Sequence, residues 1–194
     1  MNILIIVMCC PNKHISESIT YQSFQSIFNK IKTVTPIYTR NNVNDINEIL
    51  KTHRISGIII GGSESRVLQK NRLDVPDKIF KYNVPILGIC YGFQLMMERI
   101  CKESSIGTFK NNKETKTTRY LIIDTPILKV PRSKYYFLHH DYVKQIPKEW
   151  SKDIIQGEQI WMAHYKNMIG VQFHPEKYQT SGLRFFSNWI KLLH

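Results

Sequence analysis

The 194-residue sequence predicts an α/β protein with a single doubly wound, mostly parallel sheet, helices on both faces and a small antiparallel extension. Two observations predict this class. Short, fully apolar segments typical of buried strands alternate with segments of helical spacing, four times by residue 103. The later part of the chain has short strand-like segments separated by turns, which is typical of antiparallel pairing. Because such sheets bind ligands at the carboxyl ends of their strands, functional residues are expected there.

The first half of the chain supplies the alternation. Residues 2–8 are continuously apolar and rich in β-branched side chains, and they predict a buried first strand. A helix is expected next, with Ser16, Ser18 and Thr20 as candidate caps and an apolar stripe that reaches residue 31. The following elements are predicted strands over 33–38 and 57–60, with a short helix over 45–52 between them.

The apolar run 84–89 leads directly to Cys90, which stands between Gly88 and Gly92 and is followed by a helical stripe. A strand that turns into a helix at one residue is a nucleophile elbow, and the glycines make room for its tight turn. The helix start favours the thiolate form of Cys90, and the N–H of Tyr91 can point at the oxygen of an attacked carbonyl. Cysteine is also common in cores, so this stretch alone leaves a structural cysteine open.

A second apolar run, residues 169–173, leads to His174 and Glu176. In an extended segment, residues i and i+2 face the same side, so Glu176 is expected to hold the imidazole of His174 while the ring faces Cys90. Nucleophile, base and orienting carboxylate are therefore all present, in the order cysteine, histidine, glutamate.

The motifs GICYGFQ at 88–94 and GVQFHPE at 170–176 resemble those of the class I glutamine amidotransferases, and the tyrosine after the cysteine is most similar to the glutaminase part of GMP synthase. The resemblance runs from about residue 56 to the carboxyl end. It implies a flavodoxin-like fold, hydrolysis of the glutamine side-chain amide and delivery of ammonia to a synthetase. It assigns Cys90 as nucleophile, His174 as base and Glu176 as its partner.

The glycine pair Gly61-Gly62 follows the predicted strand 57–60. Glycines let a backbone approach a ligand closely and expose N–H groups, and a tetrahedral acyl intermediate needs two such donors. By the resemblance, Gly62 and Tyr91 supply these donors. Ser63 replaces the proline of the family pattern, which leaves the rigidity of the loop open, and an ordinary strand-to-helix turn is the alternative.

The resemblance also implies substrate contacts at Gln94, one helical turn after the nucleophile, and at His139 and Asp141. Residues 138–143 resemble the family segment S-H-G-D-x-V, with His140 in the place of glycine. This departure is expected to crowd the pocket or to alter the contact with a partner. A metal held by the two adjacent histidines is not expected, because no third ligand stands at a suitable spacing.

The remaining segments complete the sheet. Residues 102–118 are polar without clear periodicity and predict a surface connection. Short strands of an antiparallel extension of the sheet are predicted over 119–123, 135–138, 160–164 and 168–173. The helical stripe over 182–193 is expected to pack on the sheet.

The amino-terminal region departs from the family. Its D-F-G-S-Q start is replaced by Met8-Cys9-Cys10-Pro11-Asn12, so the usual surface for a synthetase is not assured. The chain also has no G-x-x-x-x-G-K loop and no room for a synthetase domain, so that partner is expected to be a separate subunit.

Length and composition limit the number of domains, the binding partners and the location. The length and a hydrophobic content of 42% suit one domain over residues 1–194. The net charge of +12 comes from scattered lysines without a basic run, so nucleic-acid binding is not expected. Four cysteines without C-x-x-C spacing, no membrane span and no signal-peptide pattern predict a cytoplasmic protein.

The sequence therefore predicts a glutaminase that acts on glutamine, without cofactor or metal, for a separate synthetase. Two alternatives stay open at this point. One is a stand-alone hydrolase of γ-glutamyl compounds, and the other is a catalytically weak regulatory module with the same fold.

Overall fold

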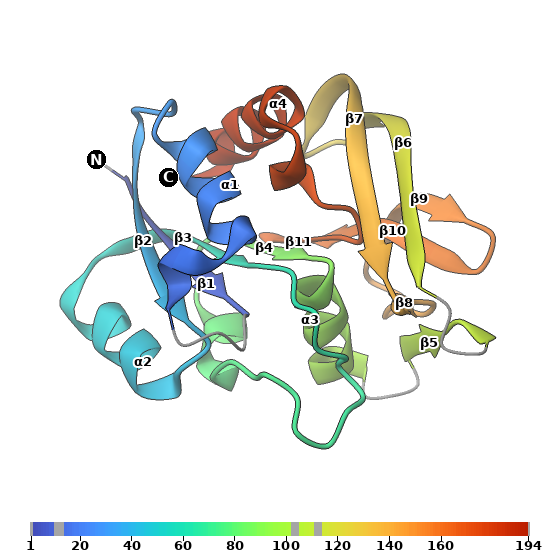
Figure 1. Ribbon diagram of the computed structural model, residues 1–194, viewed down its shortest axis with the longest axis horizontal. Coiled ribbons are helices and arrows are strands. Elements are labelled where there is room, and N and C mark those ends of the chain that lie inside the picture. Colours follow the sequence, from blue (N-terminus) through green and yellow to red (C-terminus); the bar gives the residue numbers. More distant parts are fainter. Residues whose placement is uncertain (1, 10–13, 102–104, 111–113, 194) are drawn as a thin grey trace.

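The computed structural model describes residues 2–9, 14–101, 105–110 and 114–193, and its centre is a seven-stranded sheet (Figure 1). The strand order is β2-β1-β3-β4-β11-β10-β9. The strands are β1 (Asn2–Met8), β2 (Val34–Arg40), β3 (Ile55–Ile60), β4 (Ile86–Ile89), β9 (Ser151–Gln156), β10 (Gln159–Tyr165) and β11 (Met168–Val171). The first four and β11 are parallel, whereas β10 and β9 add an antiparallel edge. The predicted fold class is confirmed.

Helices cover both faces of this sheet. The α-helices within the described residues are α1 (Ile19–Phe28), α2 (Val43–Thr52), α3 (Tyr91–Cys101) and α4 (Gln179–Trp189). Helices α1 and α4 pack on one face and α2 and α3 on the other (Figure 1). The pleat of β1 divides its side chains between the two cores: Leu4 and Ile6 face the first, Ile5 and Val7 the second. All four are fully buried, so β1 is an interior strand that is covered on both faces.

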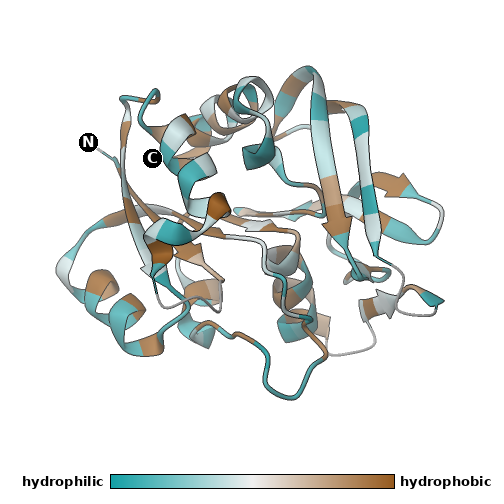
Figure 2. Cartoon of the chain, viewed as in Figure 1, coloured by the Kyte–Doolittle hydropathy of each residue, from teal (hydrophilic) through white to brown (hydrophobic). Residues whose placement is uncertain are grey.

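Helix α2 shows how the local sequence sets an element. The side chain of Asn42 caps it by accepting hydrogen bonds from the N–H groups of Asn44 at 2.8 Å and Asp45 at 3.4 Å. Ile46 and Leu50, one turn apart, are buried, and polar residues alternate with apolar ones along the helix (Figure 2). The helix begins two residues before the predicted start because Asn42 supplies the cap.

The predicted strands over 119–123 and 135–138 exist, but they do not extend the main sheet. They belong to β6 (Thr115–Asp124) and β7 (Lys129–His139), which pair with each other as a separate two-stranded sheet. The reason lies in the inward face of β7. Tyr135 and Phe137 are fully buried and pack on Phe173, so this hairpin forms a second layer over the core.

Two further expectations need correction. The segment 102–118 is not only a surface connection, because β5 (Ile106–Thr108) pairs with β8 (Asp141–Val143) and β6 already begins at Thr115. Residues 102–104 and 111–113 lie outside the described residues, as do Cys10, Pro11 and Asn12. Strand β11 ends at Val171; it pairs antiparallel with β10, as predicted, but it also pairs parallel with β4 and so joins the extension to the parallel core.

The helical ends also differ in detail. Ser18 occupies the N-cap position of α1, but its side chain makes no capping hydrogen bond. The predicted helix over 182–193 is α4 followed by the 3₁₀ turn η6 (Ile190–Leu192). Among the described residues, no helix is both long and apolar enough to cross a membrane.

Candidate active site

Cys90 lies at the single residue between strand β4 and helix α3. Its backbone φ is +51°, in the left-handed region that residues other than glycine rarely adopt. A Cβ on Gly92 would lie 2.1 Å from the carbonyl oxygen of Ile60 in β3, and one on Gly88 would lie 2.8 Å from the backbone of Gly92. Both positions therefore require glycine, and the expected nucleophile elbow is present.

Cys90 is only 3% exposed, and its sulfur contacts two polar groups. It donates to the carbonyl oxygen of Leu138 at 3.5 Å, and the side-chain amide of Gln172 donates to the sulfur at 3.6 Å. The amide donor can also stabilise a thiolate, because it is directed at the atom that becomes negative.

His174 is held from two sides. Its backbone N–H donates to the carbonyl of Tyr136 in β7 at 2.8 Å, and its Nδ1 donates to Oε1 of Glu176 at 2.8 Å. The expected contact with Glu176 exists, although the expected extended geometry does not. His174 is extended, but Glu176 lies in the 3₁₀ turn η5 (Pro175–Lys177), which brings the 4%-exposed carboxylate back to the ring.

The imidazole of His174 lies among negative groups. Burial acts to lower the pKa of His174, but the charges of Glu176 and of a Cys90 thiolate outweigh burial, and the pKa rises well above 6.5. Nε2 of His174 makes no hydrogen bond within the described structure. The ring can therefore accept the thiol proton and keep it as an imidazolium.

The backbone of Gly62 packs directly against this pair. A Cβ at Gly62 would lie 2.6 Å from Cε1 of His174 and 3.6 Å from Cβ of Cys90. Tyr91 is the first residue of α3, where backbone N–H groups have no acceptor inside the helix. The structure thus brings both expected oxyanion donors close to Cys90.

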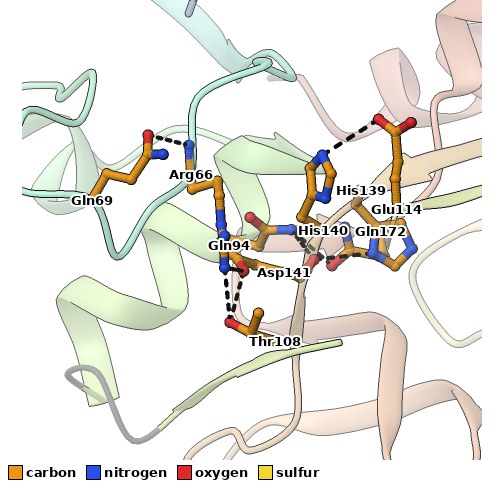
Figure 3. A network of polar contacts seen from close by, with 9 residues as sticks. All are labelled: Arg66, Gln69, Gln94, Thr108, Glu114, His139, His140, Asp141 and Gln172. Carbon is orange, nitrogen blue, oxygen red and sulfur yellow. Dashed lines mark hydrogen bonds and ion pairs between the residues drawn. The ribbon is translucent and has the colours of Figure 1, made fainter. Parts of the chain in front are cut away.

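A cleft of about 610 Å³ opens over these residues, and Gln94, His139 and Asp141 all line it. Gln94 donates to the carbonyl oxygen of Asp141 at 2.6 Å and to Gln172 at 3.4 Å (Figure 3). His140, in the place of the family glycine, also lines the cleft and lies 3.6 Å from Glu114. The residues expected to contact substrate therefore form one wall.

His139 is a neutral member of this wall. Its Nδ1 donates to the carbonyl oxygen of Asp141 at 3.0 Å, and burial lowers its pKa to about 4. Its Nε2 is buried without a hydrogen-bond partner among the described residues, so it keeps an unused lone pair. In the described part of the chain, no three His, Cys, Asp or Glu side chains are grouped to hold a metal ion.

Three residues of the site were not expected from the sequence. Gln172 lies inside the GVQFHPE motif, and its place two residues before His174 could have suggested a role beside the thiol. Arg66 and Thr108 contact the side chain of Asp141 at 2.8 Å each. They stand 75 and 33 residues away from Asp141, and no motif connects them to it.

This elbow, with its histidine, glutamate and glycine loop at the carboxyl edge of a parallel sheet, is the arrangement that cysteine-dependent acyl transfer requires. Comparison with known families gives the particular class. The model described as "Glutamine amidotransferase class-I" matches residues 17–192, and the chain belongs to this family of glutamine-hydrolysing enzymes.

Curated relatives place the chain near one branch of the family. It is 33% identical over 140 residues to a GMP synthase [glutamine-hydrolyzing] of Caldicellulosiruptor saccharolyticus. The matched region covers 69% of this chain and 27% of that protein. It is 30% identical over 161 residues to that of Prochlorococcus marinus, with 77% and 28% covered. The chain thus spans little more than a quarter of the length of these relatives.

Solved structures show the same fold. A putative GMP synthase subunit from Thermoplasma acidophilum has a TM-score of 0.73 at 19% identity, with 99% of this chain and 94% of that one covered. The glutaminase domain of Trypanosoma brucei CTPS, solved with bound acivicin, has a TM-score of 0.67 at 13% identity, with 100% and 96% covered.

Proposed function

We propose that this chain is the glutaminase component of a GMP synthase-like system, which hydrolyses the side-chain amide of glutamine and supplies ammonia to a separate synthetase. One observation carries the proposal. Nε2 of His174, held through Nδ1 by Glu176, has no hydrogen-bond partner in the described structure and lies in the cleft that also contains Cys90 and Gly62. The GMP synthase relatives favour this function over that of a stand-alone γ-glutamyl hydrolase.

The first half-reaction begins with transfer of the thiol proton from Cys90 to His174, which forms a thiolate and an imidazolium. The thiolate attacks the amide carbon of glutamine, and the carbonyl oxygen becomes an oxyanion that the N–H groups of Gly62 and Tyr91 bind. The imidazolium then protonates the leaving nitrogen, the C–N bond breaks and ammonia departs. A glutamyl thioester remains on Cys90.

The second half-reaction uses the same groups in reverse order. Neutral His174 takes a proton from water, the hydroxide attacks the thioester carbon and the C–S bond breaks. Glutamate leaves, and Cys90 returns to its resting state. Glu176 stabilises the imidazolium in both halves, while Gln94, His139 and Asp141 shape the wall against which glutamine lies.

Ammonia released into water is protonated and lost to synthesis, so a partner that consumes it is part of the proposal. We expect the isolated chain to be slow and the docked chain faster, because docking can order the Gly61-Gly62 loop. The net charge of +12 favours an acidic partner surface, and association is then weakened by salt. A cytoplasmic location fits this role.

The test titrates a separately encoded GMP synthetase subunit from the same source against the rate of glutamate formation, at low and high ionic strength. We predict a rise in rate that saturates with the subunit, and a higher apparent Kd at high salt. The Cys90→Ala chain is the control for background hydrolysis. Full activity without the subunit, unchanged on its addition, would favour the stand-alone hydrolase instead.

A further inference from the structure

The loop after β3 carries Gly62, but it lacks the proline that would stiffen it. Among the described residues, the hydroxyl of Ser63 constrains it locally by accepting a hydrogen bond from the N–H of Ser65 at 3.0 Å. At the start of the loop, the N–H of Gly61 donates to the carbonyl of Val7 at 3.0 Å. Neither bond fixes the far end of the loop against the wall of the cleft.

Arg66 makes that connection. Its Nη2 lies 2.8 Å from Oδ1 of Asp141 and its Nε lies 3.3 Å from Oδ2, which is a two-pronged contact with both carboxylate oxygens (Figure 3). The hydroxyl of Thr108 donates to the same Oδ1 at 2.8 Å. The Asp141 side chain is 1% exposed and that of Arg66 is 25% exposed. The pair, with Thr108, therefore joins the loop to β5 and β8.

The backbone of Asp141 links this ion pair to residues near Cys90. Its carbonyl oxygen accepts from Gln94 at 2.6 Å and from His139 at 3.0 Å. Gln94 in turn donates to Oε1 of Gln172, whose Nε2 donates to the sulfur of Cys90. A chain of polar contacts thus leads from the glycine loop, through Asp141, to Cys90. Figure 3 shows this chain from Arg66 as far as Gln172.

We propose that Arg66 is a positioning residue for the oxyanion hole: its contact with Asp141 holds the Gly62 N–H at the distance from Cys90 that the tetrahedral intermediate requires. The inference rests on the proposed function. A buried carboxylate that loses its cation becomes an uncompensated charge, so the wall relaxes toward water and the loop moves with it. A displacement of about 1 Å at such a site is enough to slow the chemistry by about 10²-fold.

The test compares two reagents on Cys90 in the whole chain. The chloromethyl ketone analogue of glutamine forms an oxyanion when the thiolate attacks its ketone carbon, before chloride leaves. Iodoacetamide reacts by direct displacement of iodide and forms no oxyanion. We predict that Arg66→Ala slows the ketone by about 10-fold to 10²-fold and leaves the iodoacetamide rate nearly unchanged.

Further variants and two added cations test whether the effect belongs to the guanidinium group of Arg66. Arg66→Lys keeps the charge without the fork and is expected to fall between wild type and Arg66→Ala. Guanidinium ion added to Arg66→Ala is expected to restore part of the ketone rate, whereas methylammonium is not. Arg99→Ala is the matched control, because the side chain of Arg99 is 29% exposed and ion-paired with Asp74 but lies outside the cleft.

An unchanged ketone rate in Arg66→Ala would overturn the inference. So would an equal loss with both reagents that guanidinium does not repair, since that result indicates a general structural role. Failure of the proposed function has a different signature: the wild-type chain would then show no preference for the glutamine-like ketone over a ketone without the amino acid group.

Discussion

In the proposed reaction, Cys90 depends on neighbours that stabilise its thiolate form. The positive φ of Cys90 places its sulfur at a helix start, and Gln172 donates to that sulfur. The raised pKa of His174 allows an imidazolium to stand beside a thiolate at neutral pH. Glu176 contributes by sustaining this charge, so its loss should matter less than loss of either reacting group.

We therefore predict graded losses across the triad. Cys90→Ala should abolish glutamine hydrolysis and His174→Ala should nearly do so. Glu176→Ala leaves a misoriented imidazole and should cost about 10²-fold to 10⁴-fold in kcat, the range for positioned acid–base groups. The measurement is glutamate formation by each purified variant. Equal rates in the three variants and the wild type would show that this chemistry is absent.

His139 provides a prediction on pH and stability. Its pKa is about 4 in the folded chain and 6.5 is its ordinary value, so the unfolded chain binds more protons between these values. Stability is then lost as pH falls from 6.5 toward 4, by about 3 kcal/mol from this residue. The raised pKa of His174 changes stability above pH 6.5, but it does so with or without His139, so it cancels when a His139 variant is compared with wild type.

The measurement is urea unfolding of wild type and His139→Gln at pH 7 and about pH 4. Glutamine stays neutral and keeps a donor for the Asp141 carbonyl, so the variant should lose about 3 kcal/mol less than wild type on acidification. An identical pH dependence for both chains would mean that His139 has the same pKa in the folded and the unfolded chain, which would contradict the lowered value.

The sequence predicts a site residue when its partner is near in the chain or when the residue lies in a recognisable motif. His174 and Glu176 are two positions apart, and Gly62 follows a recognisable strand. Arg66 and Asp141 are 75 positions apart, and their pairing is decided by how β5, β8 and the loop after β3 pack. No local pattern encodes that contact, so it becomes visible only in the folded chain.

At the scale of the elements, the backbones of β3, β4 and α3 pack so closely at the elbow that no side chain fits between them. The Cβ that alanine would add at Gly92 meets the backbone oxygen of Ile60 at 2.1 Å, and backbone cannot rotate away as a side chain can. Any larger residue must separate α3 from β3 and displace Cys90.

We predict that Gly92→Ala destabilises the fold by about 3 kcal/mol or more and removes the selective reactivity of Cys90. The control is Gly157→Ala. Gly157 has a φ of +58°, and nothing lies within 4 Å of the position that a Cβ would take there, so alanine should cost about 1–2 kcal/mol through backbone strain alone. Thermal unfolding and thiol labelling measure both effects; normal labelling in Gly92→Ala would contradict this view of the elbow.

The parallel core could be predicted because each strand there is a continuous apolar run beside a helical stripe. The β6–β7 hairpin could not be placed, because alternation identifies a strand with one buried face but not the layer that buries it. Strands β5 and β8 have three residues each, too few for any period to be visible.

At the scale of the whole molecule, the sheet brings distant segments to one edge. Cys90 follows β4, the glycine loop follows β3 and His174 follows β11, and these three strands are neighbours in the sheet. The second layer completes the site, because β7 contributes the Tyr136 carbonyl that holds His174 and the Leu138 carbonyl that contacts the thiol. The strand order therefore brings these three segments together within the chain itself.

Labelling with the chloromethyl ketone analogue of glutamine, followed by mass spectrometry of the peptides, asks whether Cys90 is a nucleophile tuned for glutamine. We predict one adduct, on Cys90, slowed by added glutamine. Cys9 is 1% exposed, and burial raises the pKa of the Cys101 thiol, so neither should compete. Labelling of Cys9, Cys10 or Cys101 in preference to Cys90, or labelling that glutamine does not slow, would contradict this role of Cys90.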